Sequence, residues 1–450
     1  MTQAQATALS LDDIPHPPLT PVVGHTLDLL RDPMGLHMGA AAKFGPVYKV
    51  KVLGQWRVSL GGAEALEFIL GDTQKLFSSF EGWDMLHTLF PGGLMLRDFD
   101  DHRSHRRIMQ AAFRKPVLDA YRARLEEATD TLLKDWKADQ PFKFFPAIKD
   151  MTLRMGAAVF MGLDLGDPRA DLLSNAFQAE VAAATAVIRK PVPFTKMARG
   201  MAARTTLTQH FSLMIPERRD NPGDDFFSQM VLAADEDGNA WSTEDLVDHF
   251  NFLMMAAHDT TASALTKVAW ALATYPEWQD KIIAEVDALP DAPMDDAGLA
   301  SMHSADLVLK EALRLLPPVP LIPRRAVRDF EWQGHIIPAG TWVSATPGTV
   351  MLSPKHWTDP EKFDPDRFGP DRAEDRSHKY AWAPFGGGAH KCIGLHFATM
   401  QVKIFLAALL KTHRIELATD TPIDWIRVPI PQPKGGLPVV LRVRAQTTVS

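Results

Sequence analysis

The stretch "APFGGGAHKCIGLHFA", residues 383–398, contains the only cysteine in this chain of 450 residues. Three glycines precede Cys392, and the residues from Ile393 onward have the apolar spacing of a helix. A thiolate stays ionised beside hydrogen-bond donors or positive charge, which the start of a helix supplies. Consecutive glycines also leave room for a flat, bulky cofactor. These features favour a cysteine that binds a haem iron.

Cys392 has other possible uses, which the residues alone leave open. A lone cysteine is often a small buried side chain without a chemical role. Cys392 could also be a nucleophile, with His390 or His396 as its base. Zinc binding is less well supported, because these three residues are at most three ligands and no second pair lies nearby.

The composition is that of an ordinary soluble globular protein, with 46% hydrophobic and 23% charged residues. The net charge of −7 gives no indication of nucleic-acid binding. A single cysteine excludes an intramolecular disulfide, which fits a reducing compartment. Residues 1–25 lack the basic start and apolar core of a signal peptide or membrane anchor. We therefore expect a cytoplasmic protein without a membrane anchor.

The pattern along the chain predicts one mostly helical domain, 1–450, with a smaller strand-rich part. Residues 1–24 form a proline-rich N-terminal segment. The longest helix is predicted for 242–275, where Ser242 and Asp245 resemble a capping box. The other predicted elements are a hairpin at 47–60, helices at 117–136, 145–162, 168–187 and 203–216, strand-like runs at 329–346, a helix at 393–412 and a strand at 437–444.

The motif FGGGAHKCIG resembles the haem-ligand loop of the cytochrome P450 family, which has the form F-x-x-G-x-x-x-C-x-G. Its fixed positions are matched by Phe385, Gly388, Cys392 and Gly394. The resemblance implies the cytochrome P450 fold, mainly α with a smaller β-rich part and a long central helix over the haem. The cofactor would be haem b, iron protoporphyrin IX, with Cys392 as the iron ligand. The implied cofactor-binding residues are His102, Arg106, Arg324, Phe385, Gly386, His390, Cys392, Gly394 and Ala398.

Four of these positions are implied as partners of the haem propionates. The segment "HRSHRR" places His102 and Arg106 on one helical face, and Arg324 and His390 match two further partners. Buried carboxylates need such partners. Arg325 is an alternative to Arg324, because the alignment could shift by one residue.

The segment "AAHDTT", residues 256–261, resembles the oxygen-binding segment of the family. This implies that Asp259 and Thr260 deliver protons. Ala257 stands where the family usually has glycine, and its methyl group could narrow the oxygen pocket. Taken alone, Asp259 and Thr260 could also be helix-interior polar side chains that bond to the backbone.

The segments "EALR" and "FDPDRF" resemble those that supply a structural triad in the family, here Glu311, Arg314 and Arg367. Glu311 and Arg314 are one helical turn apart, so from the residues alone they could be a surface salt bridge. The segments "FDPDRF" and "HIIPAGTWVSAT" resemble the microsomal-like branch found in some bacteria more closely than the camphor-hydroxylase type.

The implied activity is monooxygenation, in which one atom of O2 enters a C–H bond and the other becomes water. Electrons would come from NAD(P)H through a ferredoxin reductase and a ferredoxin, which the basic residues Arg103, Arg107, Arg114 and Lys391 could attract. The alternatives are a peroxide-driven peroxygenase, whose known members commonly lack the acid–alcohol pair, and a haem gas-binding protein.

The substrate pocket implied by the resemblance is almost entirely apolar, although apolar residues also form any protein core. A lipophilic substrate such as a steroid, terpenoid or fatty acid is therefore expected, and no conspicuous charged anchor for a carboxylate emerges. The implied pocket residues are Trp83, Met85, Leu86, Leu89, Phe90, Phe177, Val181, Ala256, Val319, Leu321, Ile322 and Ile430.

Overall fold

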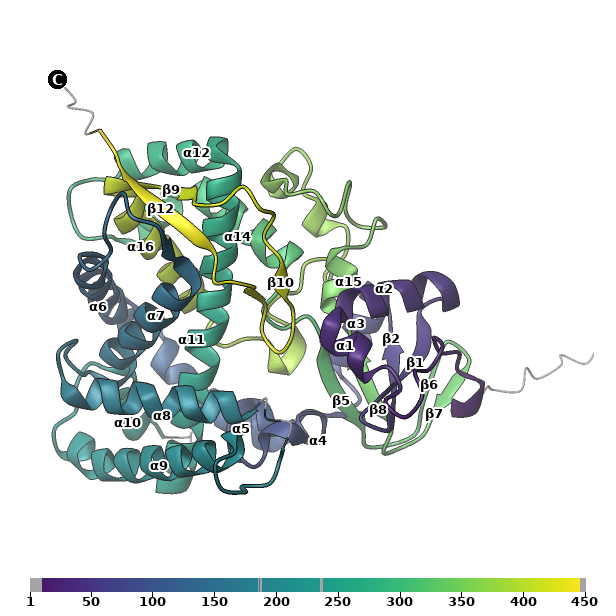
Figure 1. Cartoon of the computed structure of the whole chain (residues 1–450). Coiled ribbons are helices and arrows are strands. Elements are labelled where there is room, and N and C mark those ends of the chain that lie inside the picture. Colours follow the sequence, from purple (N-terminus) through teal and green to yellow (C-terminus); the bar gives the residue numbers. More distant parts are fainter. Residues whose placement is uncertain (1–9, 185, 187, 235–237, 446–450) are drawn as a thin grey trace, which may run out of the picture. The chain divides into compact units, whose positions relative to one another are not determined.

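The structure is a computed structural model that describes residues 10–184, 186, 188–234 and 238–445, and its chain forms two compact units (Figure 1). Unit 1 comprises Met1–Asp84, Met95–Phe99 and Arg314–Cys392. Unit 2 comprises Met85–Leu94, Asp100–Leu313 and Ile393–Ser450. Unit 2 is mostly helical and unit 1 contains the largest sheet, so the prediction of a mainly α chain with a smaller β-rich part is confirmed.

Unit 1 is built on a five-stranded sheet with the strand order β1-β2-β8-β5-β3. β1 (Val47–Val52) and β2 (Gln55–Leu60) form the predicted hairpin. β2 pairs in parallel with β8 (Trp342–Ala345), whose other neighbour is the antiparallel β5 (Ile322–Ala326). β3 (Phe77–Ser78) completes the sheet at the far side of β5.

One face of this sheet forms the apolar core of unit 1. Val58 and Leu60 of β2, with Val343 of β8, belong to one buried cluster with side chains of α3 (Ala63–Gly71). Strand residues alternate between the two faces, so Arg57 and Trp342 lie on the opposite face. The remaining elements of unit 1 are η1 (Leu11–Asp13), α1 (Thr26–Arg31), α2 (Pro33–Phe44), α4 (Ser79–Gly82), β6 (Phe330–Trp332), β7 (His335–Ile337), α15 (Pro347–Met351), η5 (Pro365–Phe368), η6 (Glu374–Arg376) and η7 (Gly388–His390).

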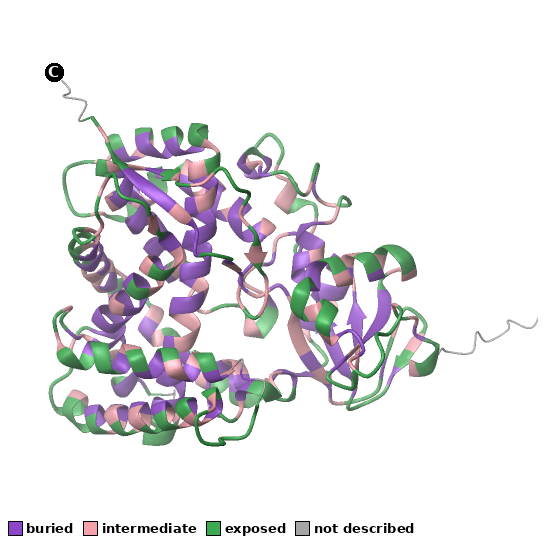
Figure 2. Cartoon of the chain, in the orientation of Figure 1, coloured by how far each residue is buried: buried purple, intermediate pink, exposed green. Residues whose placement is uncertain are grey.

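Unit 2 is organised around α11 (Thr243–Thr274), which agrees with the long helix predicted from the sequence. The Ser242 hydroxyl accepts a hydrogen bond from the Asp245 backbone N–H at 3.0 Å and so caps the helix, as expected. Most of α11 is buried (Figure 2), because α7 (Phe144–Met161), α9 (Lys196–Asp220) and α16 (Leu395–Thr412) pack against it.

The other elements of unit 2 complete the helical layers and two small sheets. They are α6 (Lys115–Leu133), β4 (Phe142–Lys143), α8 (Pro168–Ala184), α10 (Phe226–Leu232), α12 (Pro276–Asp287), α13 (Asp296–Ser301), β9 (His413–Leu417), β10 (Trp425–Ile426), β11 (Gln432–Pro433), β12 (Pro438–Val443) and η4 (Gln110–Phe113); α5 (Phe99–Met109), α14 (His303–Leu315), η2 (Asp84–Leu86) and η3 (Leu94–Leu96) cross the unit boundaries.

Four predicted helices have ends that differ by two or more residues in the structure, and one of them, α6, spans Lys115–Leu133 where 117–136 was predicted. α9 is longer than the predicted 203–216 and continues through Pro216, which lacks the N–H that a helix interior normally uses. The helix after Cys392 begins at Leu395 rather than at Ile393, with Gly394 as its N-cap. α8 ends at Ala184, and positions 185 and 187 of its predicted span lie outside the described residues.

One segment of the described chain, Gly388–Thr412, is long and apolar enough to cross a membrane by length and composition. However, 61% of its most apolar window is buried, and α16 within it packs against α6 and α12. The segment therefore has the character of a core helix.

Candidate active site

The cysteine loop of unit 1 is closed by backbone hydrogen bonds and leaves the Cys392 side chain exposed. The Cys392 N–H donates to the Phe385 carbonyl at 2.9 Å, and the Lys391 N–H donates to the Gly388 carbonyl at 3.2 Å. This exposure excludes the buried structural role for Cys392. The loop instead presents a thiol where a cofactor or another ligand can reach it.

The three glycines of the loop are required for different reasons. A Cβ atom at Gly388 would lie 1.8 Å from the Leu70 carbonyl oxygen, and one at Gly387 would lie 2.2 Å from the Tyr380 ring. At Gly386, where φ is +67°, the nearest atom to such a Cβ would be Ile322 Cδ1 at 3.8 Å. Only at Gly386 would a Cβ atom therefore make no more than an ordinary van der Waals contact. The expectation that all three glycines make room for a cofactor is corrected, because the protein itself fills the space beside the other two.

Arg324 is a buried cation without a carboxylate partner. Its side chain is only 4% exposed and donates to the Pro323 carbonyl at 2.9 Å, and no carboxylate of a described residue lies within ion-pair distance. Burial lowers the pKa of Arg324 to about 10, although the charges of Asp98 and Asp72 oppose this shift. A buried guanidinium needs an anion, and a propionate group fits this requirement.

The alternative propionate partner, Arg325, is already engaged. It is partly exposed, donates to the Gly340 carbonyl at 3.0 Å and lies 3.4 Å from the Glu81 carboxylate. The geometry of unit 1 therefore favours Arg324. Together with the exposed Cys392 thiol, Arg324 fits an anionic, iron-containing cofactor.

The other cofactor-binding residues predicted from the sequence lie on separate elements. His390 is in η7 of unit 1, beside the cysteine loop. His102, which is 1% exposed, and Arg106 lie one turn apart on α5 in unit 2. Gly394 is the N-cap of α16, and its carbonyl accepts a hydrogen bond from the Ala398 N–H at 2.8 Å. Their roles toward a cofactor remain predictions.

Asp259 is held by a lysine and a histidine within unit 2. Its carboxylate lies 2.7 Å from Lys149 Nζ of α7 and 3.2 Å from His258 Nε2 of α11. Burial alone would raise the pKa of Asp259, but His258 and Lys149 outweigh it and lower that pKa to about 2. Asp259 is therefore ionised at neutral pH. Lys149 was not predicted, because no spacing in the sequence links these two distant positions.

Thr260 satisfies its hydroxyl within α11. Thr260 Oγ1 donates to the Ala256 carbonyl at 2.7 Å, and Thr261 Oγ1 donates to the Ala257 carbonyl at 2.8 Å. The backbone-bonded interpretation thus describes Thr260 in this structure but not Asp259. The Thr260 hydroxyl can rotate to another acceptor at the cost of one hydrogen bond.

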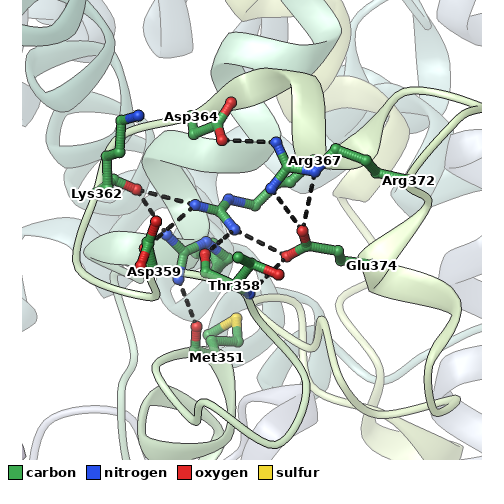
Figure 3. Close-up of polar contacts among 9 residues, drawn as sticks. Met351, Thr358, Asp359, Lys362, Asp364, Arg367, Arg372 and Glu374 are labelled. Carbon is green, nitrogen blue, oxygen red and sulfur yellow. Dashed lines mark hydrogen bonds and ion pairs between the residues drawn. The ribbon is translucent and has the colours of Figure 1, made fainter.

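The three residues of the predicted structural triad are buried, and two of them have further partners. Arg314 and Arg367 are fully buried, and Glu311, one turn before Arg314 on α14, is buried too. Arg367 donates to the Thr358 carbonyl at 2.7 Å and to the Glu374 carboxylate at 2.8 Å (Figure 3).

Two further residues of this network were missed from the sequence. Glu374 bridges Arg367 and Arg372, and Arg372 also donates to Asp364 at 2.6 Å (Figure 3). Arg314 donates to the Met351 carbonyl at 2.7 Å. Arg314 is therefore not part of a surface salt bridge, since its buried guanidinium donates to an interior carbonyl group.

The implied pocket residues fall into both units. In unit 1, Trp83, Val319, Leu321 and Ile322 are partly buried. In unit 2, Leu86, Leu89, Phe90 and Phe177 are buried, Val181, Ala256 and Ile430 are partly buried, and Met85 is 46% exposed. Phe177 packs on Phe211 of α9 with ring centroids 6.0 Å apart, which is a core contact between α8 and α9.

A sequence profile of the Cytochrome P450 family matches residues 14–435. The chain belongs to the cytochrome P450 family. It is 39% identical to a putative cytochrome P450 136 of Mycobacterium tuberculosis, over 94% of this chain and 87% of that protein. It is also 30% identical to cytochrome P450 26C1 of Homo sapiens, over 93% of this chain and 86% of that protein.

A solved structure confirms the cytochrome P450 fold predicted from the cysteine loop. The retinoic acid-bound cyanobacterial P450 CYP120A1 superimposes with a TM-score of 0.86 at 28% identity, covering 96% of this chain and all of that one. P450 proteins are haem-containing monooxygenases, so the predicted enzyme class is confirmed.

Proposed function

We propose that this P450 uses haem b, with Cys392 as iron ligand, to hydroxylate a lipophilic small molecule within a single catalytic domain in the cytoplasm. The observation that carries this proposal is the exposed Cys392 thiol on a loop closed by backbone hydrogen bonds, beside the buried Arg324. Arg324 would hold a haem propionate, with His102, Arg106 and His390 as further partners. Haem supplies oxygen activation when it is bound, and the thiolate donates electron density that favours O–O cleavage.

The chain's own contribution to proton delivery centres on Asp259. Because this carboxylate is ionised at neutral pH, the protons that it passes on would come from the Lys149 ammonium group that contacts it. The Lys149 side chain is 31% exposed and so connects Asp259 with solvent. Thr260, the next residue on α11, would hold the proton at its hydroxyl that the haem-dependent chemistry consumes, and this proton would be replaced through Asp259.

Replacing Thr260 by alanine should uncouple electron consumption from product formation. Without its hydroxyl, we expect the product formed per NAD(P)H to fall about tenfold, with hydrogen peroxide rising in proportion. Thr261→Ala is the matched control, since Thr261 makes the same backbone hydrogen bond one residue later. Equal coupling in the Thr260 variant and the wild type would remove Thr260 from proton delivery.

Replacing Lys149 by methionine should raise the pKa of Asp259. The pKa of Asp259 in the folded protein, about 2, lies below its ordinary value of 3.8. Ionised Asp259 therefore stabilises the fold fully above pH 3.8, and this stabilisation disappears as the pH falls toward 2. We expect the variant to lose about 1–2 kcal/mol of unfolding free energy at pH 7, because Lys149 is partly screened by solvent. The loss should shrink as the pH falls below the ordinary value of 3.8.

Urea unfolding at several pH values measures this loss. Arg154→Met is a matched control, because Arg154 lies on the same helix and pairs at 3.0 Å with the exposed Asp150. A pH-independent loss in the Lys149 variant would show that Lys149 acts through packing and not through the charge of Asp259.

The substrate is proposed to be an apolar molecule of the terpenoid, steroid or fatty-acid type. The P450 structure with a TM-score of 0.86 contains retinoic acid, an isoprenoid carboxylic acid. This supports terpenoid-like acids as the first compounds to test here. The partly buried Val319, Leu321 and Ile322 of unit 1 supply apolar contacts for such a compound.

A ferredoxin, reduced by an NAD(P)H-dependent reductase, is the proposed electron donor. Arg103, Arg107, Arg114 and Lys391 are exposed, which suits attraction of an acidic protein. We expect the rate of reduction to fall about tenfold between low and high ionic strength. Arg107→Glu should slow the reduction of the haem protein at low salt. Arg219→Glu, at an exposed arginine of α9, is the control and should not change this rate. A rate of reduction that does not depend on salt would contradict electrostatic attraction.

The proposal is tested by reconstitution with a bacterial ferredoxin, its reductase, NADPH and isotopically labelled dioxygen. A product carrying one labelled oxygen atom, formed only with NADPH, is the expected result. Product formed from hydrogen peroxide without NADPH would instead establish the peroxygenase. Reversible gas binding without any product from a broad panel of lipophilic compounds would favour the gas-binding protein.

A further inference from the structure

A tryptophan flanked by two arginines lies on the second face of the unit 1 sheet, where Tyr48, Val50 and Val52 of the neighbouring β1 form a smaller apolar cluster with Ala40 of α2. Arg57 of β2 and Arg325 of β5 are both register partners of Trp342 on β8. The guanidinium carbon of Arg57 lies 4.4 Å from the centroid of the Trp342 ring, and that of Arg325 lies 5.6 Å from it. Two positive charges are thereby concentrated around one aromatic side chain.

The two arginines differ in what they bind. Arg325 has the Glu81 carboxylate at 3.4 Å and the Gly340 carbonyl. Arg57 makes no hydrogen bond or ion pair with any residue in the described part of the chain, and its Nε atom is buried without a partner. Burial lowers the pKa of Arg57, and the charge of Asp84 only partly opposes this. Arg57 is thus a partly desolvated cation without an anion.

A second buried donor in the same unit also lacks an acceptor. Trp83, the residue before Asp84, has a buried indole Nε1–H without a hydrogen-bond partner. Buried donors without acceptors are costly, and native proteins usually satisfy them with a ligand or water. Arg324 of the same sheet also has no carboxylate partner among the described residues. The proposed haem propionate would be its partner.

We propose that Arg57, beside Trp342, is an anion subsite that binds the carboxylate of an apolar monocarboxylic acid substrate. A guanidinium matches a carboxylate through two parallel hydrogen bonds, and its planar shape is already oriented by stacking on the indole. This inference rests on the proposed function and narrows its substrate class to apolar acids. It also supplies the charged anchor that the sequence did not reveal.

The subsite has a consequence for where such an acid is oxidised. Ile322 lies beside the cysteine loop, because its Cδ1 is 3.8 Å from the Cβ position of Gly386. Along β5, Arg325 is three residues farther on, or about 10 Å. Arg57 lies two strands from Arg325 at the same register position, so a carboxylate at Arg57 would be bound away from Ile322 and the cysteine loop. The oxidised carbon should lie in the part of the chain remote from the carboxylate.

Binding titrations test the subsite without requiring turnover. The haem-loaded protein is titrated with retinoic acid, palmitic acid and the methyl ester of each, followed by the shift of the haem absorbance and by tryptophan fluorescence. The wild type should bind at least one acid more tightly than its ester. Arg57→Gln should weaken binding of that acid about tenfold or more and leave the ester unchanged.

Three further variants exclude a folding effect. Arg57→Lys should restore part of the affinity for the acid, because it keeps the charge but loses the planar fork. Asp84→Asn, at an exposed position, should tighten binding of the acid alone by removing a like charge near Arg57. Arg31→Gln, at an exposed arginine of α1, should change neither ligand.

Equal affinity of the wild type for acids and esters would overturn the inference, as would equal weakening of both ligands in Arg57→Gln. These results would leave the proposed function intact if neutral lipophilic compounds are hydroxylated. Conversely, tighter binding of the acid than of its ester, lost in Arg57→Gln, would establish the subsite. If no oxidised product then forms, the result counts against the proposed function.

Discussion

Replacing Cys392 by serine is expected to abolish NADPH-dependent monooxygenation. A serine hydroxyl remains neutral at physiological pH and cannot donate electron density as a thiolate does. The reduced, carbon monoxide-treated wild type should show the strongly red-shifted Soret band of a thiolate-ligated haem. The serine variant should bind haem but lose this band, and its product formation should fall to the background rate.

Lys391→Gln is the matched control for this experiment, since Lys391 is the exposed neighbour of Cys392 in the same loop. It should keep the red-shifted band. Full monooxygenase activity in Cys392→Ser with intact haem would contradict the assignment of Cys392 as the iron ligand. Wild-type protein that takes up no haem on reconstitution would return Cys392 to the role of a nucleophile.

Replacing Arg367 by alanine is expected to lower the free energy of unfolding by about 3–5 kcal/mol, the cost of breaking a buried ion pair. The Arg367 side chain is fully buried, and its partner Glu374 is only 12% exposed. The substitution would leave that carboxylate without one of its cations and would leave the Thr358 carbonyl without a donor. Urea unfolding followed by circular dichroism measures the effect.

Arg372→Ala separates the buried interaction from a surface one. Arg372 also pairs with Glu374, but its side chain is 35% exposed, so its loss should cost about 1 kcal/mol or less. Similar losses in both variants would show that burial does not decide the strength of this network. A loss in Arg367→Ala of under 1 kcal/mol would mean that water replaces the guanidinium in the interior.

Features that depend on local spacing could be predicted from the sequence. The cysteine loop is set by residues a few positions apart, and α11 has a clear helical period with a capping serine at its start. Arg314 and Arg367 could be singled out because the motifs EALR and FDPDRF have a fixed spacing. In each case the physical determinants lie within one or two turns of the chain.

Contacts between distant segments could not be predicted in this way. Lys149 meets Asp259 only because α7 packs against α11, and neither segment has a pattern that encodes the pairing. Arg57 occupies an ordinary polar position in an alternating strand, and its lack of a partner is visible only once the neighbouring strands are placed. Glu374 lies in η6, and no motif links it to Arg367 or Arg372.

The cysteine loop also constrains how this sequence can vary over evolution. A side chain at Gly387 would meet the Tyr380 ring, so a smaller residue at 380 could compensate for it. A side chain at Gly388 would instead meet the Leu70 carbonyl oxygen, which no substitution removes. Gly386 is restricted by its φ of +67° alone and could tolerate asparagine. The three consecutive glycines are therefore constrained in different ways. A change at Gly387 could be compensated at Tyr380, a change at Gly388 could not be compensated, and a change at Gly386 is limited by the backbone conformation.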